Sequence, residues 1–221
     1  MSDLKVDGII ASTGTNTALT LQGKGTGTVD IGDGASSFPD ADGSADQVIK
    51  TDGSGTLAFV TLASAGWTLE SEVATTSGDD ITVASGLSSP TEVFIAFHGL
   101  SQSNTETLDI VLGDSGGFET SAYISTAGMI TVTTVSVEQG TDCIQVNQNN
   151  DAGGTTEGLV YGALIDATNN TWAFSHSIGA SNDQVFFGGG TKSLSSTLTQ
   201  IRLSSGASAT FDAGSCTVGT R

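Results

Sequence analysis

The sequence predicts an all-β protein in two parts, a short β-rich stem followed by an antiparallel β-sandwich. Apolar residues nowhere keep the i, i+3, i+4, i+7 spacing of a helix, but in many segments they alternate with period two. Glycine accounts for 30 of the 221 residues, and clusters of Gly, Asp, Asn and Ser separate those segments. Many short strands joined by tight turns are typical of a sandwich.

The first 62 residues hold few large apolar side chains. Residues 18–22, 28–32 and 57–61 are predicted strands, because each alternates apolar and small or polar residues between glycine turns. A segment of roughly 60 residues is marginal as a folding unit even with a good core. It therefore either stays flexible or buries its apolar side chains against other copies of itself, and we expect the second. The boundary should fall near residues 63–66, which gives units 1–64 and 65–221.

The alternation is clearest in the C-terminal part. In residues 91–100, Val93, Ile95 and Phe97 alternate with Phe94, Ala96 and His98, which predicts a strand buried on one face and partly on the other. The same period recurs at Leu108, Ile110 and Leu112; at Ile130, Val132 and Thr134; at Leu159, Tyr161, Ala163 and Ile165; and at Ile201 and Leu203. Glycine-rich sequences at 78–80, 113–117, 151–154 and 188–190 are the predicted turns. The pattern predicts roughly ten strands after Trp67.

The chain is strongly acidic, with 24 Asp and Glu against 6 Lys and Arg and a formal net charge of −18. So few basic residues cannot form the patch that nucleic acid or an anionic membrane requires. No run reaches the ~18 apolar residues of a membrane span, and the N-terminus lacks the pattern of a secretory signal. We therefore expect a soluble protein with no nucleic-acid partner and no membrane insertion. One bridge between Cys143 and Cys216 is conceivable, but two buried thiols are the preferred interpretation.

Three stretches resemble segments of bacteriophage tail-fibre and related virion proteins. Residues 15–31 form a strand, a Gly-Thr-Gly turn and a second strand, similar to a unit of fibre stems. Residues 38–59 resemble a collar-like element that precedes a distal fibre domain, with Pro39 followed by a Gln-Val-Ile-Lys-Thr-Asp-Gly-Ser-Gly run. Trp67 and residues 92–100, 113–118, 199–206 and 211–215 resemble parts of the jelly-roll domains that end some phage fibres.

The resemblance implies a homotrimer, in which a short trimeric β-rich stem is followed by an antiparallel jelly-roll β-sandwich. The stem would attach to other virion proteins, and the sandwich would project from the tail or capsid of a particle assembled in the host cytoplasm. The implied function is a short tail fibre or fibre-like projection that mediates host attachment by binding a host surface glycan or protein. The main alternative is a capsid decoration or head-fibre protein that stabilises or coats the particle. A third is a glycan-degrading tail enzyme.

Catalytic patterns are weak, and we expect no enzyme. The only imidazoles are His98 and His176, and each falls in a strand-like run, where a packed or edge histidine is the simpler interpretation. The sequence has no HExxH, CxxC or P-loop spacing. Carboxylate pairs for glycan cleavage are too abundant in an acidic chain to indicate a site.

Asp40, Asp42 and Asp46 place three carboxylates in one glycine-containing turn, the type of ligand that Ca²⁺ prefers. Their spacing does not match an EF-hand loop, and Asx turns that stabilise the bend are the preferred interpretation. No cofactor is therefore expected, and Ca²⁺ remains the weaker alternative.

Residues 147–156 are the most polar stretch between two predicted strands and form a predicted loop. As a loop, this stretch is either a solvated connection or a tip that contacts a receptor. The receptor-contact candidates are Asn147, Gln148, Asn149, Asn150 and Asp151. Trp67 and Trp172 adjoin apolar runs, which predicts that both pack in the core.

Overall fold

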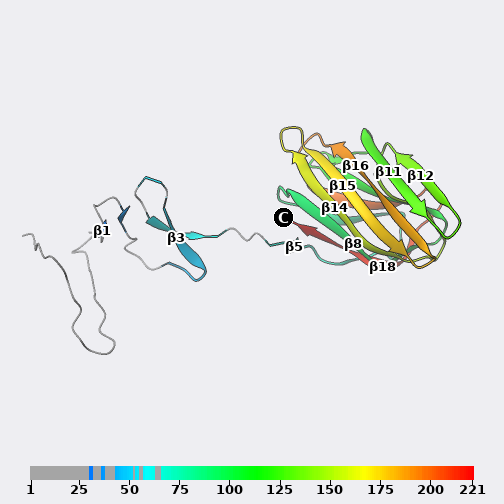
Figure 1. Ribbon diagram of the computed structural model, residues 1–221, viewed down its shortest axis with the longest axis horizontal. Coiled ribbons are helices and arrows are strands. Elements are labelled where there is room, and N and C mark those ends of the chain that lie inside the picture. The colour runs from blue at the N-terminus through cyan, green and yellow to red at the C-terminus, as the bar shows by residue number, and fades with distance from the viewer. Residues whose placement is uncertain (1–29, 32–35, 38–42, 52, 55–56, 63–65) are drawn as a thin grey trace, which may run out of the picture. The chain divides into compact units, whose positions relative to one another are not determined.

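The computed structural model describes residues 30–31, 36–37, 43–51, 53–54, 57–62 and 66–221, and two units divide the chain, Met1–Ser64 and Ala65–Arg221. Every regular element in these described ranges is a β-strand, and every strand pair is antiparallel. The prediction of an all-β, antiparallel fold is therefore confirmed (Figure 1).

Among its described residues, the N-terminal unit contains two pairs of short antiparallel strands. Strand β1 (Asp30–Ile31) pairs with β2 (Ser36–Ser37), and β3 (Gln47–Thr51) pairs with β4 (Leu57–Thr61). The predicted strand at 57–61 is confirmed, the one at 28–32 is confirmed only at β1, and the one at 18–22 lies outside the described residues. In the hairpin of β3 and β4, Lys50 lies opposite Ala58, and Val48 lies opposite Val60.

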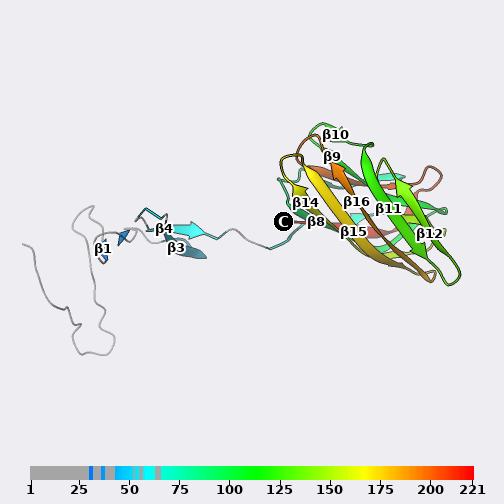
Figure 2. The ribbon, with the colours of Figure 1, turned by 45° about the horizontal axis from the view of Figure 1, so that its top comes forward.

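The C-terminal unit consists of two sheets that enclose one hydrophobic core (Figures 1 and 2). The large sheet has nine strands, in the order β12 (Val135–Gly140), β11 (Tyr123–Ile130), β16 (Gln184–Ser193), β15 (Thr171–Ala180), β14 (Thr156–Asp166), β8 (Glu92–Gln102), β18 (Phe211–Thr220) and β5 (Thr68–Leu69), with β6 (Val73–Ala74) also on β18. The small sheet has five strands, in the order β10 (Gly117–Phe118), β9 (Glu106–Asp114), β17 (Gln200–Ser205) and β7 (Asp80–Ser85), with β13 (Ile144–Asn150) also on β9.

Alternate residues of each strand build the core, as period two predicts. In β8, Val93, Ile95 and Phe97 are buried against Ile110 of β9 and Ile201 of β17 in a single cluster. Because both sheets contribute to one core, the unit is a β-sandwich, which is the coarser part of the predicted fold.

Two local predictions are wrong. Val132 is not in a strand, because β11 ends at Ile130 and the amide of Thr131 donates to the carbonyl of Thr134 in a turn. Residues 188–190 are not a turn but lie inside β16. A side chain at Gly189 would place its Cβ 2.3 Å from the carbonyl oxygen of Phe174 on β15, so glycine is needed there for close strand packing.

The two cysteines, Cys143 and Cys216, are free and buried, which confirms the preferred interpretation. Within the described residues, no helix has the length and apolar character needed to cross a membrane.

Candidate functional site: an exposed aromatic surface

Three aromatic side chains meet on the outer face of the large sheet. Phe94 of β8 points away from the core, because its neighbours Val93 and Ile95 point into it. Strand register places Tyr161 of β14 directly opposite Phe94 on one side and Gly219 of β18 opposite it on the other. We call Trp67, Phe94 and Tyr161 the aromatic surface.

Trp67, which lies just before β5, holds this group together. Its ring centroid is 5.0 Å from that of Phe94 at an interplanar angle of 62°, and 6.4 Å from that of Tyr161 at 75°. Both are edge-to-face contacts, a geometry that aromatic pairs favour. Trp67 is nevertheless 37% exposed and Tyr161 40% exposed, so the rings offer apolar surface to solvent.

Glycine allows the rings to lie close to the sheet. A Cβ at Gly219 would fall 2.2 Å from the ring of Phe94, so that ring occupies the space where a side chain on β18 would stand. The aromatic surface therefore rests on the sheet backbone, where the strands determine its position.

A charged pair borders the aromatic surface. Glu92 forms an ion pair with Arg221, and the guanidinium carbon of Arg221 lies 5.2 Å from the centroid of the Trp67 ring, a cation–π distance. Backbone hydrogen bonds of 3.0 Å join the same two residues in both directions. Desolvation and a hydrogen bond with the Glu92 carboxylate raise the pKa of Tyr161. The site thus combines aromatic rings with a hydrogen-bond donor, the Arg221 guanidinium, with an acceptor, the Glu92 carboxylate, and with the Tyr161 hydroxyl.

This combination is suited to binding a sugar. The C–H groups of a pyranose face are apolar and pack on aromatic rings, while its hydroxyls need donors and acceptors nearby. Here the guanidinium of Arg221, the carboxylate of Glu92 and the hydroxyl of Tyr161 supply those groups around the rings.

The receptor-contact candidates from the sequence are not brought together as a surface loop. Strand β13 continues to Asn150, and Asn147 and Gln148 are buried, so the prediction that they form part of a loop is wrong. The reason is hydrogen bonding within the sandwich, because Asn147 Oδ1 accepts the amide of Leu108 at 2.7 Å and Gln148 Oε1 accepts the hydroxyl of Ser136 at 2.5 Å. Buried polar side chains with such partners are structural.

The remaining candidates lie at the end of that strand. Asn149 and Asn150 belong to β13, and their side chains are outside the described set. Asp151 is exposed in the turn that follows, where its carboxylate accepts weak hydrogen bonds from Asn182 at 3.4 Å and Gln184 at 3.5 Å. A receptor role for Asp151 stays a prediction.

The two histidines differ in their surroundings. His98 is on the outer face of β8, with its Nδ1 atom 3.4 Å from Glu157. His176 of β15 points into the sandwich, and its burial lowers its pKa to about 4. It is therefore a neutral core histidine at ordinary pH.

The candidate calcium ligands fall in the N-terminal unit. Asp40 and Asp42 lie outside the described residues, and Asp46 is exposed in the turn before β3 with φ of 64°. Within the part of the chain that the structure describes, no group of three or more His, Cys, Asp or Glu side chains could hold a metal ion.

Sequence reasoning missed the aromatic surface because it assigned Trp67 to the core, whereas only Trp172 is buried there. One signal was present. Phe94 alternates with the inward residues of β8, so it had to face outward. Its meeting with Trp67 and Tyr161 depends on strand order, which the local pattern does not contain.

Comparisons of the chain with protein-family models, with curated proteins and with solved structures found no match.

Proposed function

We propose that the protein is a bacteriophage virion structural protein, a short tail fibre or fibre-like projection, whose sandwich binds a host surface glycan noncovalently. The observation that carries the proposal is the aromatic surface with its charged border, Glu92 and Arg221. The proposed binding has no chemical step, since a receptor has only to be held.

The N-terminal hairpin supports the proposal of a trimeric stem. Of the described residues between 43 and 62, none is buried, and Val48, Ile49 and Leu62 are exposed apolar side chains. A two-stranded hairpin without a core is marginally stable in water. Three copies around one axis would cover these side chains and would leave the other end of each stem to bind the particle.

The chain path of the sandwich supports a jelly-roll assignment. The last two strands lie inside different sheets: β17 lies between β9 and β7, and β18 lies between β8 and β5. Connections that cross between the two sheets in this way are typical of jelly rolls. Several sandwiches on one particle would bind by avidity, so each aromatic surface can be weak.

The direct test compares variants of the full chain on an array of bacterial surface polysaccharides, read by fluorescence. Trp67→Ala and Tyr161→Ala each remove one exposed ring and should weaken binding at least fivefold, on the basis of about 1–3 kcal/mol per stacked ring. Val132→Ala is the matched control, because Val132 is an exposed apolar residue in the turn after β11, away from the aromatic surface. Equal binding by all three variants would exclude the aromatic surface, and release of reducing ends would favour the glycan-degrading enzyme.

The virion assignment has its own test. Gold-labelled antibody on intact particles should mark the tail, while label spread over the capsid would favour the decoration or head-fibre alternative. By light scattering the full chain should have the mass of a trimer, and a chain starting at Ala65 should associate more weakly. A monomeric full chain would contradict the stem.

A further inference from the structure

The outer face of the large sheet carries a second feature, away from the aromatic surface. On β11, β12 and β16, six of the side chains that point away from the core are large and apolar. We call this set the aliphatic patch after its five aliphatic members, Ile124, Ile130, Val135, Val137 and Val185. Phe187 is its one aromatic member, and all six side chains are exposed.

Strand register joins five of the six members directly, while Ile124 lies two residues beyond Thr126 on the same face. Ile130 of β11 lies opposite Val135 of β12 and opposite Val185 of β16, which forms one apolar row. In the next row Gly128 takes the middle position between Val137 and Phe187, and a Cβ at Gly128 would fall 2.5 Å from the Phe187 ring. The ring therefore lies over β11, and the surface between the strands is filled rather than grooved.

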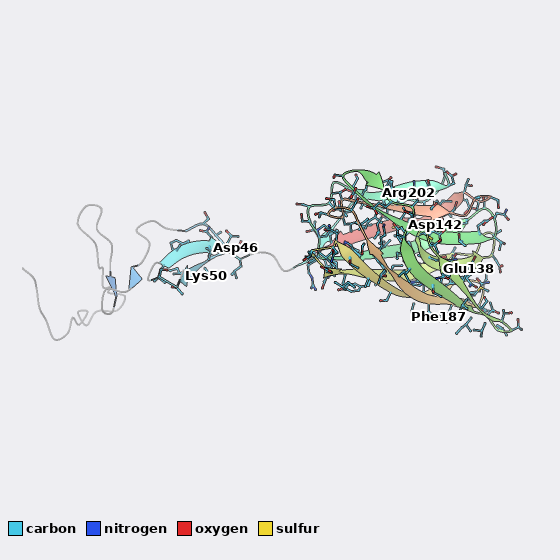
Figure 3. The ribbon with its side chains drawn as sticks, turned by 90° about the horizontal axis from the view of Figure 1, so that it is seen from above. Asp46, Lys50, Glu138, Asp142, Phe187 and Arg202 are labelled. Atoms are coloured by element: carbon cyan, nitrogen blue, oxygen red, sulfur yellow. The ribbon has the colours of Figure 1, made fainter. Side chains whose placement is uncertain are left out.

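Charged side chains border the aliphatic patch but do not lie within it; Glu157 of β14, opposite Gly179 of β15, is at this border. In a chain with a net charge of −18, the outward positions of β11, β15 and β16 hold no ionisable side chain. On β15 these positions are Thr171, Ala173, Ser175, Ser177 and Gly179. The outer face of the small sheet differs, because Arg202 and Asp80 form an ion pair of 3.0 Å there. Figure 3 shows Phe187 and Arg202 on opposite sides of the sandwich.

This distribution of charged side chains indicates what kind of partner can bind the aliphatic patch. Two copies that approach through other surfaces bring acidic groups together, and like charges in an interface are costly. At the aliphatic patch, two copies can exclude water from apolar side chains without burying a charge. We propose that a second copy of this chain docks on the aliphatic patch and the uncharged strip of β15 beside it.

The size of the aliphatic patch and the β15 strip indicates a contact too weak to hold two copies together without a second contact. From β12 to β15 the face spans three strand spacings, about 14 Å, and from Ile130 to Ile124 it spans about 20 Å, so its projected area is roughly 300 Å². A standard interface buries about 800 Å² on each partner. The contact is therefore suited to copies that are already held together, and this part of the inference rests on the proposed stem.

The test uses cysteine labelling in the full chain. Thr126→Cys places a thiol in the patch, between Gln139 of β12 and Gly189 of β16, and Thr82→Cys places a control thiol on the outer face of the small sheet. The native cysteines should not react with maleimide, because both are buried and desolvation raises their pKa values. The cysteine at position 126 should be labelled at least tenfold more slowly than the one at position 82.

Two further variants identify what protects the thiol. Val137→Asp adds a charge to the patch at a side chain that is 70% exposed and should restore fast labelling. Leu69→Asp adds a charge at a side chain that is 63% exposed on the opposite edge strand and should leave labelling slow.

Each contrary result has a definite meaning. Equal labelling at the two positions overturns the inference, even if light scattering gives a trimer, since the stem alone then holds the copies. Slow labelling in a protein with the mass of a monomer also overturns it, because the chain's own N-terminal unit is then the cover. If labelling stays slow in the Val137→Asp variant, something other than the patch contact protects the thiol at position 126, and the inference is overturned too.

Discussion

Replacing Glu119 by glutamine tests whether a buried ion pair stabilises the join between the two sheets. Lys192 of β16 is only 3% exposed, and its Nζ atom lies 2.5 Å from the Glu119 carboxylate and 5.2 Å from the centroid of the Tyr123 ring. Glu119 also accepts hydrogen bonds from the amide and the hydroxyl of Ser195. Burial alone would raise the pKa of Glu119, but the bonds from Lys192 and Ser195 outweigh it and lower the pKa.

Glutamine keeps the shape and one acceptor oxygen but leaves the Lys192 ammonium buried without a counter-charge. Removing one partner of a buried pair costs about 3–5 kcal/mol, and the partial exposure of Glu119 favours the lower end, about 3 kcal/mol. For a sandwich of this size the midpoint temperature should fall by roughly 6–12 °C. Adding Lys192→Met should recover much of the loss, because the unpaired charge is then gone.

Calorimetry at pH 7 measures the effect, and the more exposed pair of Arg202 and Asp80 provides the control. Asp80→Asn should cost no more than about 1 kcal/mol, since exposed pairs contribute little. The stability from Glu119 should be present above its ordinary pKa of 4.5 and lost as the pH falls through its lower folded pKa. If Glu119→Gln costs no more than Asp80→Asn, the account of this pair is wrong.

Two other predictions concern the interior. Burial lowers the pKa of His176 from 6.5 to about 4 and raises that of Asp109 from 3.8 to about 6, so as the pH falls the His176 contribution is lost while the Asp109 contribution is gained. The free energy of unfolding, measured by urea denaturation, should therefore fall by about 2 kcal/mol more in Asp109→Asn than in the parent chain between pH 7 and 4.5. In His176→Gln it should fall by less than in the parent chain. If the free energy of unfolding depends on pH in the same way in both variants and the parent chain, the opposite contributions of the two residues are refuted. Gly189→Ala should cost about 1–3 kcal/mol by chemical denaturation, because its Cβ would meet a β15 carbonyl, whereas Gly179→Ala, with open space around it, should stay within about 0.5 kcal/mol; similar costs would contradict the packing argument.

The local pattern predicted strands and their buried faces well. Val93, Ile95 and Phe97 were assigned correctly, because the period-two rule depends only on neighbours along the chain. The same rule failed at residues 188–190, where glycine indicates a turn in sequence but serves close packing between β15 and β16. It also failed at Asn147, where a polar side chain satisfies the amide of Leu108 inside the sandwich.

The candidate site was less predictable than the strands. Phe94 and Tyr161 are far apart in sequence, and they become neighbours only because β14 lies beside β8. Composition indicated an acidic protein but not that its charges avoid the outward positions of β11, β15 and β16. Both features depend on cross-strand register, and no local window contains it.

By itself, the sequence determined the strand-forming segments, the acidic charge and the scarcity of apolar side chains near the N-terminus, since each is a property of single residues or of their immediate neighbours. Only the tertiary structure decided which outward side chains gather into an aromatic surface and which form an uncharged apolar patch. The physical reason is that hydrogen bonding between distant strands sets which residues become neighbours, and this pairing forms only when the two sheets close on a common core.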